Sequence, residues 1–135
     1  MPVLVHLHTG VFLVSNASLE LTGPGFMLDK DVVLVTLNYR LGALGFLSTG
    51  DSEAGGNYGL KDQRLALEWV QQNIRVFGGD PNEVTLFGHG AGADCAHLHT
   101  LSEKSKHLFK QVITQSGNAL CPHAFTNDKD YYLMA

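Results

Sequence analysis

The stretch Thr85-Leu86-Phe87-Gly88-His89-Gly90-Ala91-Gly92-Ala93 decides how this chain is expected to fold. The apolar run at 84–87 is typical of a buried strand, and it breaks at Gly88. From Ala91 onward, small residues lead into a helical pattern. We therefore expect a strand, a sharp turn and a helix in immediate succession. Glycine is needed at 88 and 92 because a side chain at either position would collide with the neighbouring strand or helix.

This order of elements is the context in which a G-x-S-x-G motif presents a serine hydroxyl at the top of a parallel sheet. The middle position here is Gly90, so the turn has the outline of a nucleophile elbow without the attacking oxygen. A G-x-G-x-G turn by itself is also compatible with a plain helix-capping loop. The surrounding sequence therefore has to decide between the two interpretations.

The rest of the chain alternates between strand and helix patterns. Alternation of this kind predicts a parallel α/β sheet. The first predicted strand has no helix before it and the last has none after it, so we expect residues 1–135 to be a single partial domain, truncated at both ends. Its sheet edges are expected to be unpaired and apolar, which would make the isolated chain poorly soluble. Strands are predicted at 3–7, 31–38, 84–87 and 108–114, helices at 60–77 and 91–101, and a long glycine-containing loop at 41–57.

Composition describes an ordinary globular protein. Of 135 residues, 44% are hydrophobic and 16% charged, and the net charge is −4. Lys and Arg form no cluster, so nucleic acid is not an expected partner and a small uncharged ester or hydrophobic ligand fits better. No apolar run is long enough to span a bilayer, and the first residues do not resemble a signal peptide. The triplet starting at Asn16 is an N-glycosylation sequon.

Other reactive side chains have simpler explanations. Cys95 and Cys121 do not make a disulfide framework, and a single bridge or two free thiols both remain open. Cys95 lies more than a helical turn past Gly90 and is expected to be a packed thiol. Ser116 has no elbow pattern around it, so a structural hydroxyl is expected. Trp69 and the apolar stripe of the 60–77 helix are expected in the core.

The histidines invite a metal interpretation, which we do not favour. His97 and His99 are two residues apart and point to different sides of a helix. Surface or capping roles are expected for these and for His89 and His107, and no metal or cofactor is predicted. Arg40 and Asp62 are candidates for a buried ion pair or a loop clamp.

Several multi-residue motifs occur in order along nearly the whole chain. They are Asn38-Tyr39-Arg40-Leu41-Gly42, Gly45-Phe46-Leu47-Ser48, Gly56-Asn57-Tyr58-Gly59-Leu60-Lys61-Asp62-Gln63, Phe77-Gly78-Gly79-Asp80-Pro81 and Gln115-Ser116-Gly117. Together these motifs resemble the signatures of type-B carboxylesterases. That family includes cholinesterases and insect esterases, and the sequence most resembles an insect-type enzyme.

The resemblance implies an α/β-hydrolase fold and ester hydrolysis through a serine acyl-enzyme. It places the nucleophile at Gly90 and the backbone oxyanion donors at Gly10, Val11 and Ala91. The carboxylate and histidine partners of the nucleophile would lie beyond Ala135. The family habit of secretion slightly favours a secreted protein over a cytoplasmic one.

The departures from the family pattern fall where the chemistry would occur. Gly90 replaces the serine, His89 stands where the family often has Glu, and His8-Thr9-Gly10-Val11-Phe12 replaces a glycine run. A β-branched residue such as Val11 tolerates a positive φ badly. Two hypotheses follow: an esterase-family chain without its nucleophile, or a non-catalytic relative that uses the same fold to bind or sequester ligands.

Overall fold

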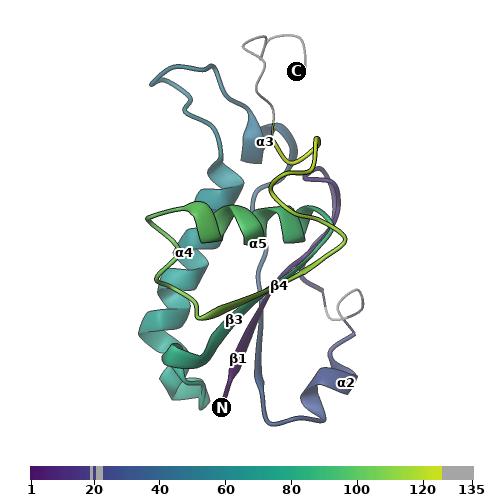
Figure 1. The fold of residues 1–135 in the computed structure, drawn as a ribbon, viewed down its shortest axis with the longest axis vertical. Coiled ribbons are helices and arrows are strands. Elements are labelled where there is room, and N and C mark those ends of the chain that lie inside the picture. Colours follow the sequence, from purple (N-terminus) through teal and green to yellow (C-terminus); the bar gives the residue numbers. More distant parts are fainter. Residues whose placement is uncertain (19, 21–22, 126–135) are drawn as a thin grey trace.

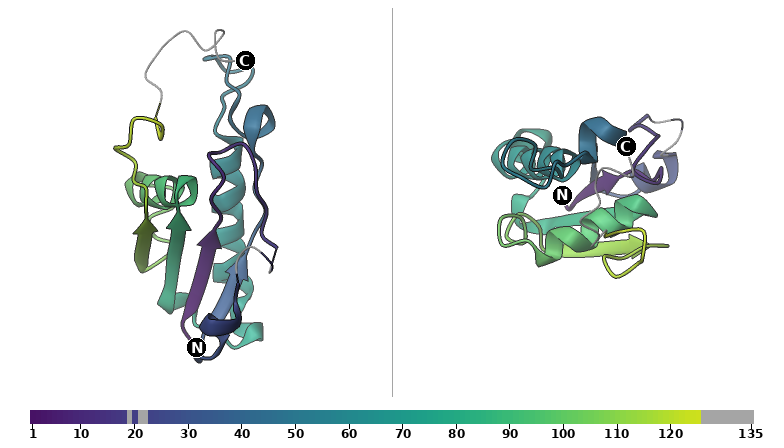
Figure 2. Two further views of the ribbon diagram at one scale, coloured as in Figure 1. Left: turned by 90° about the vertical axis from the view of Figure 1, so that its right-hand side faces the viewer. Right: turned by 90° about the horizontal axis from the view of Figure 1, so that it is seen from above.

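The chain folds around a four-stranded parallel sheet. The computed structural model describes residues 1–18, 20 and 23–125. The strands are β1 (Val3–Leu7), β2 (Val33–Thr36), β3 (Val84–His89) and β4 (Gln111–Gln115). They lie in the order β2-β1-β3-β4, and all their arrows point the same way in Figure 2. The expected parallel α/β architecture is therefore confirmed.

Helical segments connect these strands, as Figure 1 shows. Two long helices dominate: α4 (Tyr58–Asn73) precedes β3 and α5 (Ala91–Leu101) follows it. Shorter pieces are α2 (Gly25–Leu28), α3 (Gly42–Phe46) and the 3₁₀ turns η1 (Ile74–Phe77) and η2 (Pro81–Glu83). Among the described helices, none has the length and hydropathy that crossing a bilayer requires.

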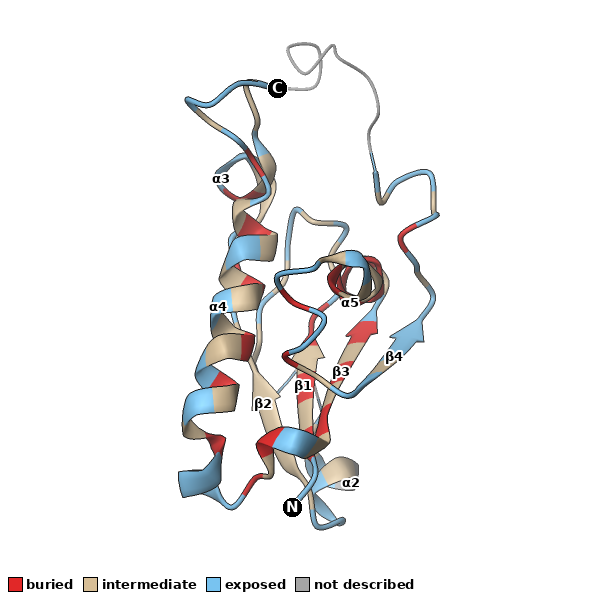
Figure 3. Cartoon of the chain, turned by 60° about the vertical axis from the view of Figure 1, so that its left-hand side comes forward, coloured by how far each residue is buried: buried red, intermediate tan, exposed pale blue. Residues whose placement is uncertain are grey.

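The core lies on one face of the sheet, where alternate strand residues meet the two long helices. Val3 pairs with Val84 and Val5 with Leu86, so their side chains share that face. Leu67 and Val70 of α4 and Cys95 and Ala96 of α5 pack into the same cluster. Figure 3 shows buried residues concentrated on β1, β3 and the inner side of α5.

The opposite face of the sheet is only partly covered. His6 and Phe87 lie there with ring centroids 5.0 Å apart, and Ile113 is in register with Phe87. The expectation that both sheet edges are apolar is wrong for β4, whose sequence Gln-Val-Ile-Thr-Gln is largely polar and exposed. A polar edge strand resists pairing with other chains better than an apolar one.

Several element boundaries differ from the sequence expectation. Regular helix stops at Asn73 rather than at Phe77, because the chain tightens into η1 before Gly78 takes a left-handed conformation with φ 79°. The predicted 41–57 loop contains α3. Strand β2 covers only 33–36 of the predicted 31–38, and β4 begins three residues later than predicted.

The prediction that Trp69 lies in the core is wrong for the described residues. Trp69 is 45% exposed and Leu65 is 65% exposed. Trp69 rests on Phe77, with ring centroids 5.8 Å apart, on the outer side of α4. The apolar stripe of α4 is wider than the sheet face that it covers, so only part of it is buried.

Candidate functional site

Gly90 occupies the apex of the turn between β3 and α5, at the carboxyl edge of the sheet. Its φ of 55° and ψ of −124° fall in a region that L-amino acids rarely adopt. Its N–H donates to the carbonyl of Gln115, and its carbonyl accepts from the N–H groups of Ala93 and Asp94. The bend is therefore anchored both to the end of β4 and to the first turn of α5.

The two flanking glycines leave room for close backbone contact. A Cβ on Gly88 would lie 2.1 Å from the carbonyl oxygen of Gly92, and a Cβ on Gly92 would lie 2.1 Å from that of Leu7. These neighbours are backbone atoms inside the sheet and helix, so they cannot move aside. This geometry matches the steric reason for glycine that the sequence suggested.

Thr9 lies directly over the apex. A Cβ on Gly90 would come within 2.6 Å of Thr9 Oγ1, and the next atom, Thr9 Cβ, would be 3.7 Å away. A side chain at position 90 would therefore make a close contact with the Thr9 hydroxyl, which rotation of the Thr9 side chain can relieve. Two departures from the family pattern, at positions 9 and 90, fit against each other in space.

The segment after β1 has an unusual backbone. Gly10, Val11 and Phe12 have φ values of 122°, 50° and 65°. A Cβ on Gly10 would lie within 1.7 Å of the Val14 carbonyl oxygen, so only glycine fits there. The Gly10 carbonyl accepts from the N–H groups of Leu13 and Val14, and the Phe12 carbonyl accepts from the N–H of Gly42. Val11, despite its branched side chain, is held in a left-handed conformation.

The third candidate oxyanion donor is the N–H of Ala91. Ala91 is the first residue of α5, and the first N–H groups of a helix have no acceptor within the helix. Helix N-termini also favour developing negative charge. The assignment of Gly10, Val11 and Ala91 as oxyanion donors nevertheless stays a prediction.

Two side-chain arrangements support this edge of the sheet. The ring of His8 stacks on Tyr39 at 4.3 Å, and the Tyr39 hydroxyl donates to the His8 carbonyl at 2.9 Å. Burial raises the pKa of Tyr39, and the neighbouring Cys95 adds to the effect. Arg40 grips both oxygens of Asp62, with Nη2 to Oδ1 at 2.7 Å and Nε to Oδ2 at 2.8 Å. This pair is a loop clamp rather than a buried ion pair, since Arg40 is exposed.

Cys95 and His99 are buried on the inner side of α5. Cys95 and Cys121 are both free thiols, so they form no disulfide with each other. Burial raises the pKa of Cys95 to about 12, as expected for an unreactive packed thiol. His99 Nε2 lies 3.0 Å from Gln63 Oε1, and burial, followed by the charge of Arg64, lowers the pKa of His99 to about 4. The expectation of a surface or capping role for His99 is therefore wrong. His97 is half-buried and caps none of the described helix ends, but its Nδ1 accepts from the N–H of Ala119 at 3.1 Å and so links α5 to the segment after β4.

The remaining predicted residues lie on the surface. His89 and His107 are exposed, and Ser116 is an exposed residue with φ 57° just after β4. Asn16 is exposed too, and its Oδ1 accepts from the N–H of Ser18 at 2.8 Å. Attachment of a glycan to Asn16 stays a prediction.

A cavity of about 890 Å³ opens beside the segment that follows β1. Its walls combine aromatic and aliphatic side chains with a histidine. Mostly apolar walls with a few polar groups are typical of sites for small organic ligands. The walls include Phe12, Phe46, Leu60, Leu98, His123 and Phe125.

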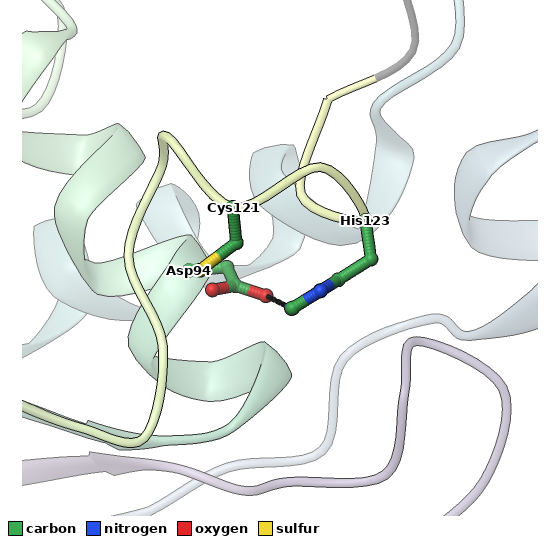
Figure 4. A group of neighbouring side chains, drawn as sticks. All are labelled: Asp94, Cys121 and His123. Carbon is green, nitrogen blue, oxygen red and sulfur yellow. Dashed lines mark ion pairs between the residues drawn. The ribbon is translucent and has the colours of Figure 1, made fainter.

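A cluster that the sequence did not single out lies one turn beyond Gly90. Asp94 of α5 faces Cys121 and His123 of the segment after β4, as Figure 4 shows. His123 Nε2 lies 3.0 Å from Asp94 Oδ2. Sequence spacing could not reveal the cluster, because Asp94 is far along the chain from the other two. The sequence feature that could have indicated this cluster is Asp94 itself, a single carboxylate among the otherwise uncharged residues 91–98.

Comparison with known proteins agrees with this geometry. A sequence model described as the carboxylesterase family matches residues 1–134. Juvenile hormone esterase of Tribolium castaneum is 53% identical over 120 residues, which is 89% of this chain and 20% of that protein. Neuroligin-3 of Mus musculus is 50% identical over 119 residues, or 88% of this chain and 14% of that protein.

A solved structure gives the same result. The crystal structure of juvenile hormone esterase from Manduca sexta, with OTFP covalently attached, superposes with a TM-score of 0.86 at 43% identity. The match covers 88% of this chain and 22% of the other. This chain thus spans between 14% and 22% of the length of these relatives.

A parallel sheet whose strand-to-helix turn stands at the carboxyl edge defines the class as the α/β-hydrolase fold. Within that class, the chain belongs to the carboxylesterase family.

Proposed function

We propose that this chain provides the elbow-containing part of a carboxylesterase-family protein that does not form a serine acyl-enzyme in its present sequence. The observation that carries the proposal is the apex itself. Gly90 offers no nucleophile, and a Cβ at this position would lie 2.6 Å from the Thr9 hydroxyl. Loss of the triad serine costs about a million-fold in a well-studied serine protease.

The proposal gives the surrounding residues specific roles. Gly88, His89 and Gly92 shape the elbow, and Gly10, Val11 and Ala91 stand at the oxyanion positions. The substrate class that the fold would accept is a small uncharged ester, in keeping with the mostly apolar cavity walls. Because the chain covers only a minor part of its relatives, what the whole protein does with such an ester is also part of what we propose.

The test is covalent labelling by an organophosphate, which traps an activated serine, followed by intact-mass measurement. The protein is used at its full natural length. We expect no label on the native sequence and some label on Gly90→Ser, reduced by the close contact between the new Cβ and Thr9 Oγ1. We expect the strongest labelling in the double variant Gly90→Ser with Thr9→Gly, which restores both nucleophile and space.

The control is Thr9→Gly alone, which opens the space without adding a nucleophile and should stay unlabelled. Stoichiometric labelling of the native protein would overturn the proposal. Equal labelling of the single Gly90→Ser variant and the double variant would show that Thr9 does not restrict position 90.

A second candidate function is ligand binding without hydrolysis. The cavity beside Phe12 and Phe46 supports it, and so does the 50% identity to neuroligin-3, a relative whose name is not that of an esterase. If the double variant stays unlabelled while the native protein binds a neutral ester analogue in a calorimetric titration, this candidate is favoured over an esterase that has lost only its serine.

A further inference from the structure

The carboxylate of Asp94 is buried, and a buried carboxylate needs a positively charged or hydrogen-bonding partner. Its side chain is fully buried, with 0% of its surface exposed. Neither oxygen accepts a hydrogen bond from the described residues, although His123 Nε2 approaches Oδ2. A buried charge without adequate compensation is costly, so such groups are usually paired or coordinate metal ions.

The surroundings of Asp94 hold this carboxylate in place. Asp94 lies in the first turn of α5, and its N–H donates to the Gly90 carbonyl at 3.1 Å. A Cβ on Gly117 would come within 2.6 Å of Asp94 Oδ1, so the backbone after β4 packs directly against the carboxylate. This tight packing fixes the direction in which the carboxylate oxygens point.

Two further metal-ligating side chains converge on the same point. One ligand atom from each of Asp94, Cys121 and His123 lies within 4.8 Å of the other two. Figure 4 shows the three side chains pointing toward one another from α5 and from the loop after β4. A tetrahedral zinc ion, with ligand bonds of about 2.0–2.3 Å, holds its ligand atoms roughly 3.3–3.8 Å apart. Small side-chain movements would therefore bring all three onto one ion.

The geometry points to a binding site for zinc or a similar divalent cation, formed by Asp94, Cys121 and His123. Thiolate, imidazole and carboxylate are the ligand types that zinc takes in proteins. On binding, the Cys121 thiol releases its proton to solvent and the thiolate sulfur donates to the ion. His123 is 63% exposed and also lines the cavity, so the fourth position is open to water or to a ligand in that cavity.

This site differs from the metal interpretation that the helix histidines suggested. His97 and His99 remain unconnected to it, because His97 accepts from a backbone N–H and His99 faces Gln63. The cation would link the first turn of α5 to the segment after β4. It would also neutralise the buried carboxylate of Asp94 close to the elbow, and it requires no esterase activity.

The test uses the full chain, reduced with a non-chelating phosphine and titrated with Co²⁺ as a spectroscopic substitute for zinc. We expect one equivalent to bind with a near-ultraviolet thiolate-to-cobalt charge-transfer band, and zinc to displace it. Replacing Cys121 with Ser should abolish the band. Asp94→Asn and His123→Gln should each weaken cobalt binding by at least about 10-fold. Removing a group that merely supports a metal ligand already lowers metal affinity by about that factor, so removing a ligand itself should cost no less.

The matched control is His107→Gln, which removes an exposed histidine outside the cluster and should bind like the native chain. Circular dichroism of each variant shows whether the fold persists, and His123→Gln, at an exposed position, is the variant least able to disturb it. Absence of the charge-transfer band in the native chain, or a band that survives Cys121→Ser, would overturn the proposal. So would equal cobalt affinity of the native chain and a folded His123→Gln variant.

Discussion

Val11 shows how one residue can carry strain next to a candidate site. It is a β-branched residue with φ 50°, and its side chain is 70% exposed, so little packing compensates for the conformation. Residues in such regions cost on the order of 1–3 kcal/mol and persist only where their surroundings impose them. Here the segment is held by backbone hydrogen bonds in which the Gly10 carbonyl accepts from the N–H groups of Leu13 and Val14. The Phe12 carbonyl likewise accepts from the N–H of Gly42.

Replacing Val11 by glycine should therefore leave stability unchanged or raise it by about 1 kcal/mol, because relief of strain exceeds or balances the added entropy of the unfolded chain. The same change at Val14, which is exposed but has no positive φ, should lower stability by roughly 1 kcal/mol. Urea unfolding of both variants measures the difference. Equal losses at the two positions would mean that Val11 is unstrained.

Helix α5 places chemically different groups within one short element. Its first turn meets the apex at Gly90, and its second half buries His99 against Gln63. With Gln63 Oε1 facing the ring, Nε2 of His99 is the donor in this contact. The lowered pKa keeps the ring neutral near pH 7, so the packing of α5 onto α4 buries an uncharged histidine.

The free energy of unfolding should fall between about pH 6.5 and pH 4 because of His99. The folded pKa is about 4 and the unfolded value 6.5, so in this window the unfolded chain binds a proton that the folded chain does not. The contribution is fully present above pH 6.5 and is lost as the pH falls toward 4. We expect His99→Gln to lose about 2 kcal/mol less than the native chain between pH 7 and pH 4.5.

Urea unfolding curves at the two pH values measure this difference. His107→Gln, which removes an exposed histidine, serves as the control and should behave like the native chain. An identical pH dependence in the native chain and His99→Gln would show that His99 is not titrating in the buried position.

On the scale of the whole molecule, the sheet has one covered and one partly open face. Parallel sheets are normally covered on both faces. The open face carries His6, Phe87 and Ile113 across neighbouring strands, and Ile113 is 45% exposed. The adjacent Val112 points the other way and packs against the core cluster.

This alternation gives a paired prediction for the 135-residue chain. Ile113→Lys should change the free energy of unfolding by less than about 0.5 kcal/mol, as exposed substitutions usually do, and should lower binding of an apolar fluorescent dye. Val112→Lys should cost at least about 3 kcal/mol because it buries a charge against the core. Equal losses for the two substitutions would contradict the assignment of faces.

The sequence alone determined the parallel α/β class, the turn at Gly90 and the steric role of Gly88 and Gly92, because these follow from local periodicity and from the absence of side chains. It also marked Val11 as a residue that would tolerate a positive φ badly, and the structure shows that Val11 does adopt one, with φ 50°. Helix ends and the exposure of Trp69 were misjudged, since these depend on how much of an apolar stripe the sheet covers.

Only the tertiary structure decided which distant residues meet. Thr9 lies over Gly90, His99 is buried against Gln63, and Asp94 faces Cys121 and His123. Each of these pairings joins segments that are separated along the chain and that the sheet order brings to one place. Periodicity describes how a segment folds but carries no information about its neighbours in space.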